Sequence, residues 1–161
     1  MQPNSNLLTP NERAEALQIE AALGRRVCET YFAEFVKLAW RIIEPKTEYV
    51  GGWHIDAIAE HLEALLRGEI RNLIINIPPR HMKSSLVTVL FPAWVWINRP
   101  EEQWLFASYS ASLSKRDSIK CRRIIESQWY REFFGIEWKL ASDQNEKMRF
   151  NNSREGYRIA T

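Results

Sequence analysis

The stretch at residues 78–85, "PPRHMKSS", carries the residue types that a phosphate-binding loop requires. Lys83 could contact phosphate oxygens, and the hydroxyl of Ser84 could hold a magnesium ion. Arg80 could stabilise the charge that develops on a phosphoryl group during transfer. The apolar run "NLIINI" at residues 72–77 precedes the stretch and a helical pattern follows it, so the loop would lie at a helix N-terminus.

The stretch lacks both glycines of the standard P-loop pattern, G-x-x-x-x-G-K-S/T. With Lys83 as the lysine, Met82 and Ile77 stand where the two glycines would be. Proline restricts φ to about −65°, so two consecutive prolines could hold such a loop rigid. Met82 would need a backbone angle suited to a residue with a Cβ. The loop alone leaves two interpretations open: a phosphate cradle, or an ordinary strand-to-helix turn with an exposed lysine.

The loop and its flanks resemble the large terminase subunit of tailed bacteriophages. The flanking segments are "GWHIDAIAEHLEALLRGEIRNLI" before the loop and "FASYSASLSKRDSIKCRRIIES" after it. The resemblance covers residues 53–161, and a glycine-poor loop of the form P-P-R-x-x-K-S/T is its most specific element. It implies an ATPase that uses ATP and Mg²⁺ to drive double-stranded DNA into a procapsid. The implied partners are DNA, the small terminase subunit, the portal of the procapsid and further copies in a homo-oligomeric ring, in the cytoplasm of a bacterial host and without a membrane.

The resemblance also assigns roles to residues. Lys83 would contact the β- and γ-phosphates, Ser84 would bind Mg²⁺, and Arg80 would sense or stabilise the γ-phosphate, so that Arg80 and Lys83 are the catalytic candidates. The family recognises adenine with a glutamine-type element before its first helix, and this chain has Trp53 and His54 at that place. His54 could equally be a residue that only starts a helix. The expected ATP-binding set is Trp53, His54, Pro79, Arg80, His81, Met82, Lys83, Ser84 and Ser85.

A basic run occupies a predicted helix at residues 112–127. Its cations could simply form a solvated helix face. Alternatively Lys115, Arg122 and Arg123 could contact DNA phosphates or the nucleotide of a neighbouring subunit, and a DNA contact of this kind would be salt-sensitive and independent of base sequence.

The elements that would position these residues alternate between helix and strand. Helical spacing predicts a helix that is capped by Asn11 and breaks at Gly24, then helices at 29–43, 54–67, 84–98 and 112–127. Residues 72–77 and 103–110 read as buried strands, and 147–152 with 156–161 as a hairpin joined through "SREG". The inward positions are Phe32, Phe35, Val36, Ala39, Ile43, Ile55, Ile58, Ala59, Leu62, Leu65, Leu66, Leu113, Ile119, Ile124 and Ile125.

This order predicts an α/β fold with a P-loop NTPase-type parallel sheet flanked by helices and preceded by N-terminal helices. We expect a flexible leader at 1–10, a helical segment at 11–47 and the N-terminal part of a P-loop ATPase domain at 48–161. Ligands of such sheets gather at the carboxyl ends of the strands, where residues 78–85 lie.

Composition limits the alternatives. The 161 residues carry a net charge of +2, so any nucleic-acid contact would be a local patch rather than a general polycation. Two widely spaced cysteines give no metal or disulfide pattern and suit a reducing cytosol. The N-terminus lacks signal-peptide features, and the longest apolar run, at 86–97, is too short to span a bilayer.

One required element of an ATPase is missing from the sequence. No apolar strand ends in Asp-Asp or Asp-Glu, the acidic pair that holds magnesium and orients the attacking water. A carboxylate cluster of the nuclease type is also absent. We therefore expect an incomplete sheet with an uncovered edge, and a chain that binds ATP but hydrolyses it poorly. The alternative function is a truncated, non-catalytic module from a decayed prophage gene that contacts DNA or protein.

Overall fold

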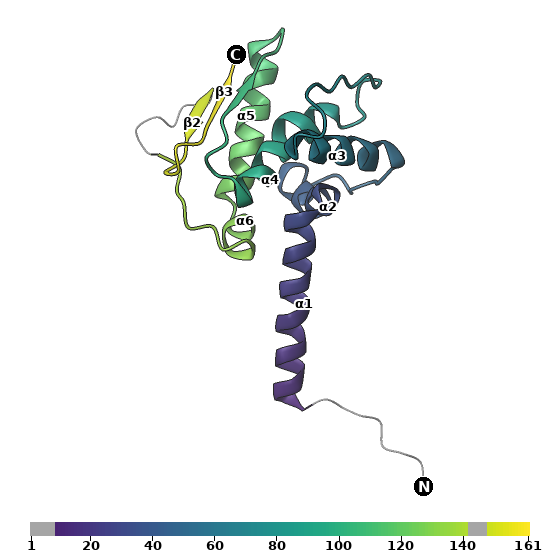
Figure 1. The fold of residues 1–161 in the computed structure, drawn as a ribbon, viewed down its shortest axis with the longest axis vertical. Coiled ribbons are helices and arrows are strands. Elements are labelled where there is room, and N and C mark those ends of the chain that lie inside the picture. The colour runs from purple at the N-terminus through teal and green to yellow at the C-terminus, as the bar shows by residue number, and fades with distance from the viewer. Residues whose placement is uncertain (1–8, 142–147) are drawn as a thin grey trace.

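A computed structural model describes residues 9–141 and 148–161. The described residues form six α-helices, one π-helical segment and three strands, which confirms the α/β class. Figure 1 shows the small sheet lying to one side of α5, with α2, α3 and α4 on the other side. The elements in chain order are α1 (Pro10–Thr30), α2 (Phe32–Ile43), α3 (Trp53–Leu66), η1 (Ser85–Leu90), α4 (Phe91–Asn98), β1 (Trp104–Phe106), α5 (Ala111–Glu126), α6 (Gln128–Phe133), β2 (Arg149–Asn151) and β3 (Tyr157–Ala160).

Helix α1 begins two residues earlier than the sequence indicates, and it does not break. Thr9 caps it, because the Glu12 N–H donates to Thr9 Oγ1 and the Thr9 N–H donates to the Glu12 carboxylate at 2.7 Å. The predictions of Asn11 as the cap and of a break at Gly24 are therefore wrong. The helix continues to Thr30 and projects away from the rest of the molecule (Figure 1), with Cys28 as its buried residue.

The core lies where α2, α3, η1 and α4 meet, and the predicted inward faces of the first two are confirmed. All five predicted positions of α2 are buried, and Ile55, Ile58, Ala59 and Leu62 of α3 are buried as well. Leu65 and Leu66 are only partly buried, because they occupy the last turn of α3. Phe32 packs edge-on against Phe91, which joins α2 to α4.

The buried face of α5 is more polar than the apolar pattern suggests. Ile124 and Ile125 are buried as predicted, whereas Ile119 is 37% exposed and Leu113 is only partly buried. The remaining buried positions of the helix are Ser114, Asp117, Ser118 and Cys121. The prediction for Ile119 is wrong. Helix α5 packs on η1 with a hydrogen bond between Thr88 and Asp117, and the spacing of apolar residues does not predict a polar side chain on the buried face.

The predicted strand at residues 72–77 is not a strand in the structure. The segment shows the alternation of a strand, since Leu73, Ile75 and Ile77 pack on the core while Ile74 is 85% exposed. None of its backbone groups pairs with another backbone group among the described residues. Without a neighbouring strand the segment forms no ladder of inter-strand hydrogen bonds. Because one of its faces is exposed to solvent, the prediction of burial on both faces is also wrong.

The sheet has three strands in the order β1-β3-β2. β1 runs parallel to β3, and β2 runs antiparallel to β3. β1 covers only residues 104–106 of the expected strand at 103–110, and Leu105 is 69% exposed rather than buried. The sheet is therefore mixed, and it does not include residues 72–77.

The predicted C-terminal hairpin is confirmed for its described residues; Lys147 lies outside them. Its turn requires Gly156, because a Cβ there would lie 1.9 Å from the carbonyl oxygen of Pro100. Glu155, next to it, has a positive φ of 67°.

The helix that follows residues 78–85 is continuous but changes its winding. It begins with the π-helical η1 and becomes α-helical at Phe91, immediately before Pro92. The widened turn therefore lies on the N-terminal side of the proline, which cannot donate a backbone hydrogen bond. No helix within the described ranges is long and apolar enough to cross a membrane.

Candidate phosphate-binding site

The structure brings most of the predicted site residues together around one cavity. This cavity has a volume of about 420 Å³ and is lined by residues 77–85 and by Arg116 of α5. Seven of the nine predicted ATP-binding residues line it, namely Pro79, Arg80, His81, Met82, Lys83, Ser84 and Ser85. We call residues 78–85 the proline loop and this space the loop cavity.

Two residues of the proline loop adopt a left-handed backbone. Arg80 has a φ of 69° and Met82 a φ of 62°. Such conformations cost side-chain-bearing residues about 1–3 kcal/mol each and persist where the surroundings impose them, often at functional sites. Met82 occupies the place of the last glycine in the standard P-loop pattern, so the loop keeps a glycine-like backbone without the glycine.

The backbone N–H groups that follow the two prolines of the loop donate to no acceptor within the part of the chain that the structure describes. The first backbone hydrogen bond after the loop runs from the Leu86 N–H to the Met82 carbonyl oxygen, at 2.8 Å. Among the described residues, the N–H groups of residues 80–85 have no hydrogen-bond acceptor. Consecutive free N–H groups at the start of a helix, with left-handed residues between them, form the concave donor surface that binds anions in proteins.

Local contacts hold the proline loop in this form. The ring Nδ1 of His81 lies 3.2 Å from the carbonyl oxygen of Pro78 and 3.0 Å from that of Pro79, which ties the loop to its own start. On the helix side, the Thr88 hydroxyl donates to the Ser84 carbonyl oxygen at 2.7 Å. The side-chain hydroxyls of Ser84 and Ser85 make no hydrogen bond to other described residues and can therefore serve a ligand.

The two remaining predicted residues, Trp53 and His54, lie beside the proline loop in a second cavity. This cavity has a volume of about 510 Å³, and its shared walls with the loop cavity are Ile77, Pro78 and His81. The Trp53 side chain is 82% exposed, and the His54 ring meets the His81 ring edge-on at 5.7 Å. We call this space the aromatic cavity. An exposed indole over an apolar floor can stack on a nucleobase.

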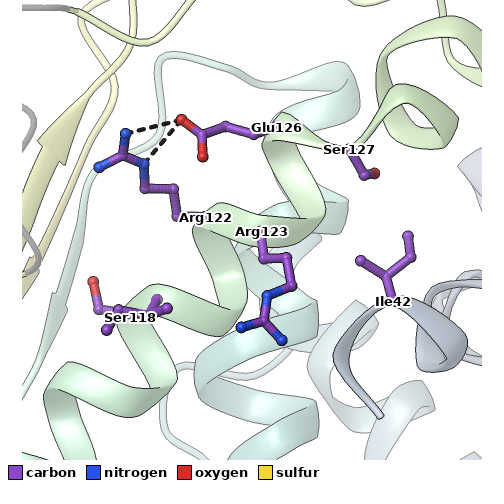
Figure 2. Close-up of a pocket in the computed structure, with 7 residues that line it drawn as sticks. Ile42, Ser118, Arg122, Arg123, Glu126 and Ser127 are labelled. Atoms are coloured by element: carbon purple, nitrogen blue, oxygen red, sulfur yellow. Dashed lines mark hydrogen bonds and ion pairs between the residues drawn. The ribbon is translucent and has the colours of Figure 1, made fainter. Parts of the chain in front are cut away.

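Two of the three basic residues predicted to contact DNA or a subunit line a cavity that is separate from the loop cavity. Arg122 and Arg123 line a cavity of about 530 Å³ between α5 and α2, which shares no lining residue with the loop cavity. Figure 2 shows Arg122 paired with Glu126, at 2.9 Å, and Arg123 directed the other way, on the side of Ile42. Lys115 is exposed near the start of α5 and lines neither cavity.

Arg116 is a site residue that sequence reasoning missed. It stands in the basic run, but the pattern of α5 does not distinguish it from the cations around it. The sequence contains one indication of its role, the adjacent Asp117. A carboxylate on the buried face of a helix must pair with a cation or accept a hydrogen bond. In the structure Asp117 is 8% exposed and accepts from Arg116 Nε at 2.9 Å.

The described residues hold no group of three or more His, Cys, Asp or Glu side chains that could by itself bind a metal ion. Comparison of the chain with protein-family models, with curated proteins and with solved structures gives no match.

Proposed function

We propose that the proline loop binds the triphosphate of ATP. The observation that carries the proposal is the run of N–H groups at residues 80–85 that have no acceptor among the described residues, together with the left-handed backbone of Arg80 and Met82. A strand-to-helix turn with no ligand gains nothing from this backbone strain, whereas an anion accepts from all of these donors at once. Lys83 and Arg80 line the same cavity and add positive charge.

The side chains around the proline loop suit the parts of a magnesium nucleotide. Lys83 would contact the β- and γ-phosphates, and Arg80 would approach the γ-phosphate. Ser84, whose hydroxyl is unengaged, would hold Mg²⁺, and the ion would neutralise phosphate charge when bound. Trp53 and His54 would receive the base in the aromatic cavity.

We further propose that this nucleotide site belongs to a DNA-packaging motor of the large terminase type. The support is the P-P-R-x-x-K-S loop, now with a backbone suited to phosphate, and the alternating burial at residues 72–77, which is that of a strand without its neighbours. In this proposal a P-loop NTPase-type parallel sheet forms when residues 72–77 gain partner strands. Double-stranded DNA, the small terminase subunit, the portal and further copies in a ring would be the partners, in the cytoplasm of a bacterial host.

The proposal leads us to expect weak binding of MgATP and little hydrolysis by these 161 residues. Among the described residues that line the loop cavity there is no carboxylate to orient an attacking water. Robust turnover by this chain would contradict that part of the proposal.

Titration calorimetry with MgATP tests the nucleotide site. Lys83→Ala should abolish binding, or weaken it at least about tenfold, because the lysine makes charge-assisted hydrogen bonds to phosphate. Lys139→Ala is the matched control, since Lys139 is exposed and lines none of the three cavities described above. Absence of nucleotide binding by the unaltered chain would refute the proposed function.

The second candidate is a non-catalytic module that contacts DNA or protein. The observation in its favour is that Lys115 and Arg123 are exposed on α5 and have no ion-pair partner among the residues described. This candidate predicts no heat of ATP binding, together with DNA binding that weakens as salt rises and that falls in a Lys115→Ala/Arg123→Ala variant.

A further inference from the structure

Arg116 reaches the loop cavity from a different element. It belongs to α5, yet it lines the loop cavity together with residues 77–85, and among the described residues it is the one lining residue from outside that segment. The described part of the cavity wall therefore has three cationic side chains, Arg80, Lys83 and Arg116, and no acidic one. A concave site with this charge balance attracts a polyanion.

A chain of contacts connects Arg116 with the backbone of the proline loop. Arg116 donates from Nε, at 2.9 Å, and from Nη2, at 2.8 Å, to the same carboxylate oxygen of Asp117. The other oxygen of Asp117 lies 3.0 Å from the Thr88 hydroxyl, which in turn lies 2.7 Å from the Ser84 carbonyl oxygen. The buried carboxylate thus orients the guanidinium relative to the loop.

The guanidinium keeps donors for a ligand after it has paired with Asp117. The Arg116 side chain is 53% exposed, whereas that of Asp117 is 12% exposed, so the pair presents its cationic side to the cavity. Nη1 has no partner among the described residues. A planar guanidinium held on one edge and free on the other is suited to a phosphoryl group, which accepts two parallel hydrogen bonds.

The two cavities define a direction for a bound nucleotide. The aromatic cavity contains Trp53 and His54 but neither Lys83 nor Arg116, and it adjoins the loop cavity through Ile77, Pro78 and His81. A nucleotide with its base beside Trp53 must therefore extend past these three shared residues to bring its phosphates to Lys83. The phosphates then occupy the loop cavity, whose wall includes Arg116.

We propose that Arg116 binds the terminal phosphate of a nucleoside triphosphate and makes the site prefer triphosphates over diphosphates. This inference rests on the proposed function, because it assumes that the proline loop holds the phosphate chain, with Arg116 as a further contact of the terminal phosphate. Asp117 positions the Arg116 guanidinium, and Thr88 holds Asp117 at a fixed place relative to the proline loop.

The test compares the affinities of MgATP and MgADP by titration calorimetry in the full chain. The unaltered chain should bind MgATP more tightly than MgADP. Arg116→Gln should weaken MgATP binding about tenfold and change MgADP binding less than about twofold, since only the triphosphate reaches the guanidinium. Arg149→Gln is the matched control, because Arg149 is exposed on β2 and lines neither cavity.

The outcomes separate this inference from the proposed function. If the unaltered chain binds neither nucleotide, the proposed function fails and the inference falls with it. If the chain binds both and Arg116→Gln weakens both equally, the nucleotide site stands and the terminal-phosphate role is wrong. Should Arg116→Gln lose MgADP binding through misfolding, Arg116→Lys replaces it. That variant keeps a cation beside Asp117 and should lose part of the preference for MgATP, and an unchanged preference would overturn the inference.

Discussion

The guanidinium of Arg158 donates from Nη2 to the carbonyl oxygen of Thr88, at 3.0 Å. In an α-helix this carbonyl would accept from the N–H of residue 92, which is a proline and has none. Arg158 lies in β3 and is 1% exposed, and it also stacks on the Phe106 ring at 4.6 Å. A residue of the sheet therefore donates to a carbonyl that Pro92 cannot serve.

This relationship predicts that Pro92 and Arg158 are energetically coupled. Arg158→Met should lower the free energy of unfolding by about 1 kcal/mol, because it removes the side-chain donor to the part-buried Thr88 carbonyl. Pro92→Ala should recover part of that loss in the double variant, since the new N–H can reach Thr88. Urea unfolding of the single and double variants measures the coupling, and additive effects would show that the proline and the arginine act independently.

The left-handed backbone at Met82 predicts opposite effects of two substitutions. Met82→Gly should retain MgATP binding, because glycine adopts a φ of 62° without strain and matches the standard loop at this position. Met82→Val should abolish it, because a β-branched residue is strongly disfavoured at positive φ. Calorimetry with MgATP measures both variants, and thermal unfolding checks that each is folded. Equal binding by the valine variant would mean that the left-handed backbone is not needed for the ligand.

Cys121 predicts a loss of stability in alkali. Burial raises the pKa of its thiol from the ordinary 9.0 to about 11, partly offset by the nearby Arg158. In the unfolded chain the thiol ionises at a lower pH, so between about pH 9 and pH 11 the unfolded state binds fewer protons than the folded one. The contribution, of the order of 2–3 kcal/mol, is thus fully present below about pH 9 and is lost as the pH rises towards 11.

Urea unfolding at several pH values between 8 and 11 measures this loss. Cys121→Ala should flatten the fall of stability with pH, although part will remain because burial also raises the pKa of Tyr130. An equally steep fall in the alanine variant would assign the pH dependence to other groups.

The sequence predicts those residues of the candidate site that belong to one continuous stretch of the chain. The order Pro78 to Ser85, with an apolar run before it and a helical pattern after it, indicated the loop, and the structure gathers those residues around one cavity. Local patterns likewise gave α2, α3 and the C-terminal hairpin, because apolar spacing and turn residues are read within one or two turns of chain.

The features that the sequence did not reveal depend on distant partners. Residues 72–77 have the composition of a strand, but strand formation requires a neighbouring backbone, which the described residues do not supply. The buried side of α5 is set by Thr88 of η1 meeting Asp117, so Ile119 is left partly exposed.

By itself the sequence determined which residues could serve a phosphate and that helices and strands would share the chain. Only the tertiary structure decided that Met82 takes the backbone of a glycine, that Arg116 joins Lys83 at the loop cavity, and that Arg122 and Arg123 lie at a different one. The physical reason is that residue type is a local property. A strained φ, a shared cavity wall and a buried charge depend on packing between elements that are distant in the sequence.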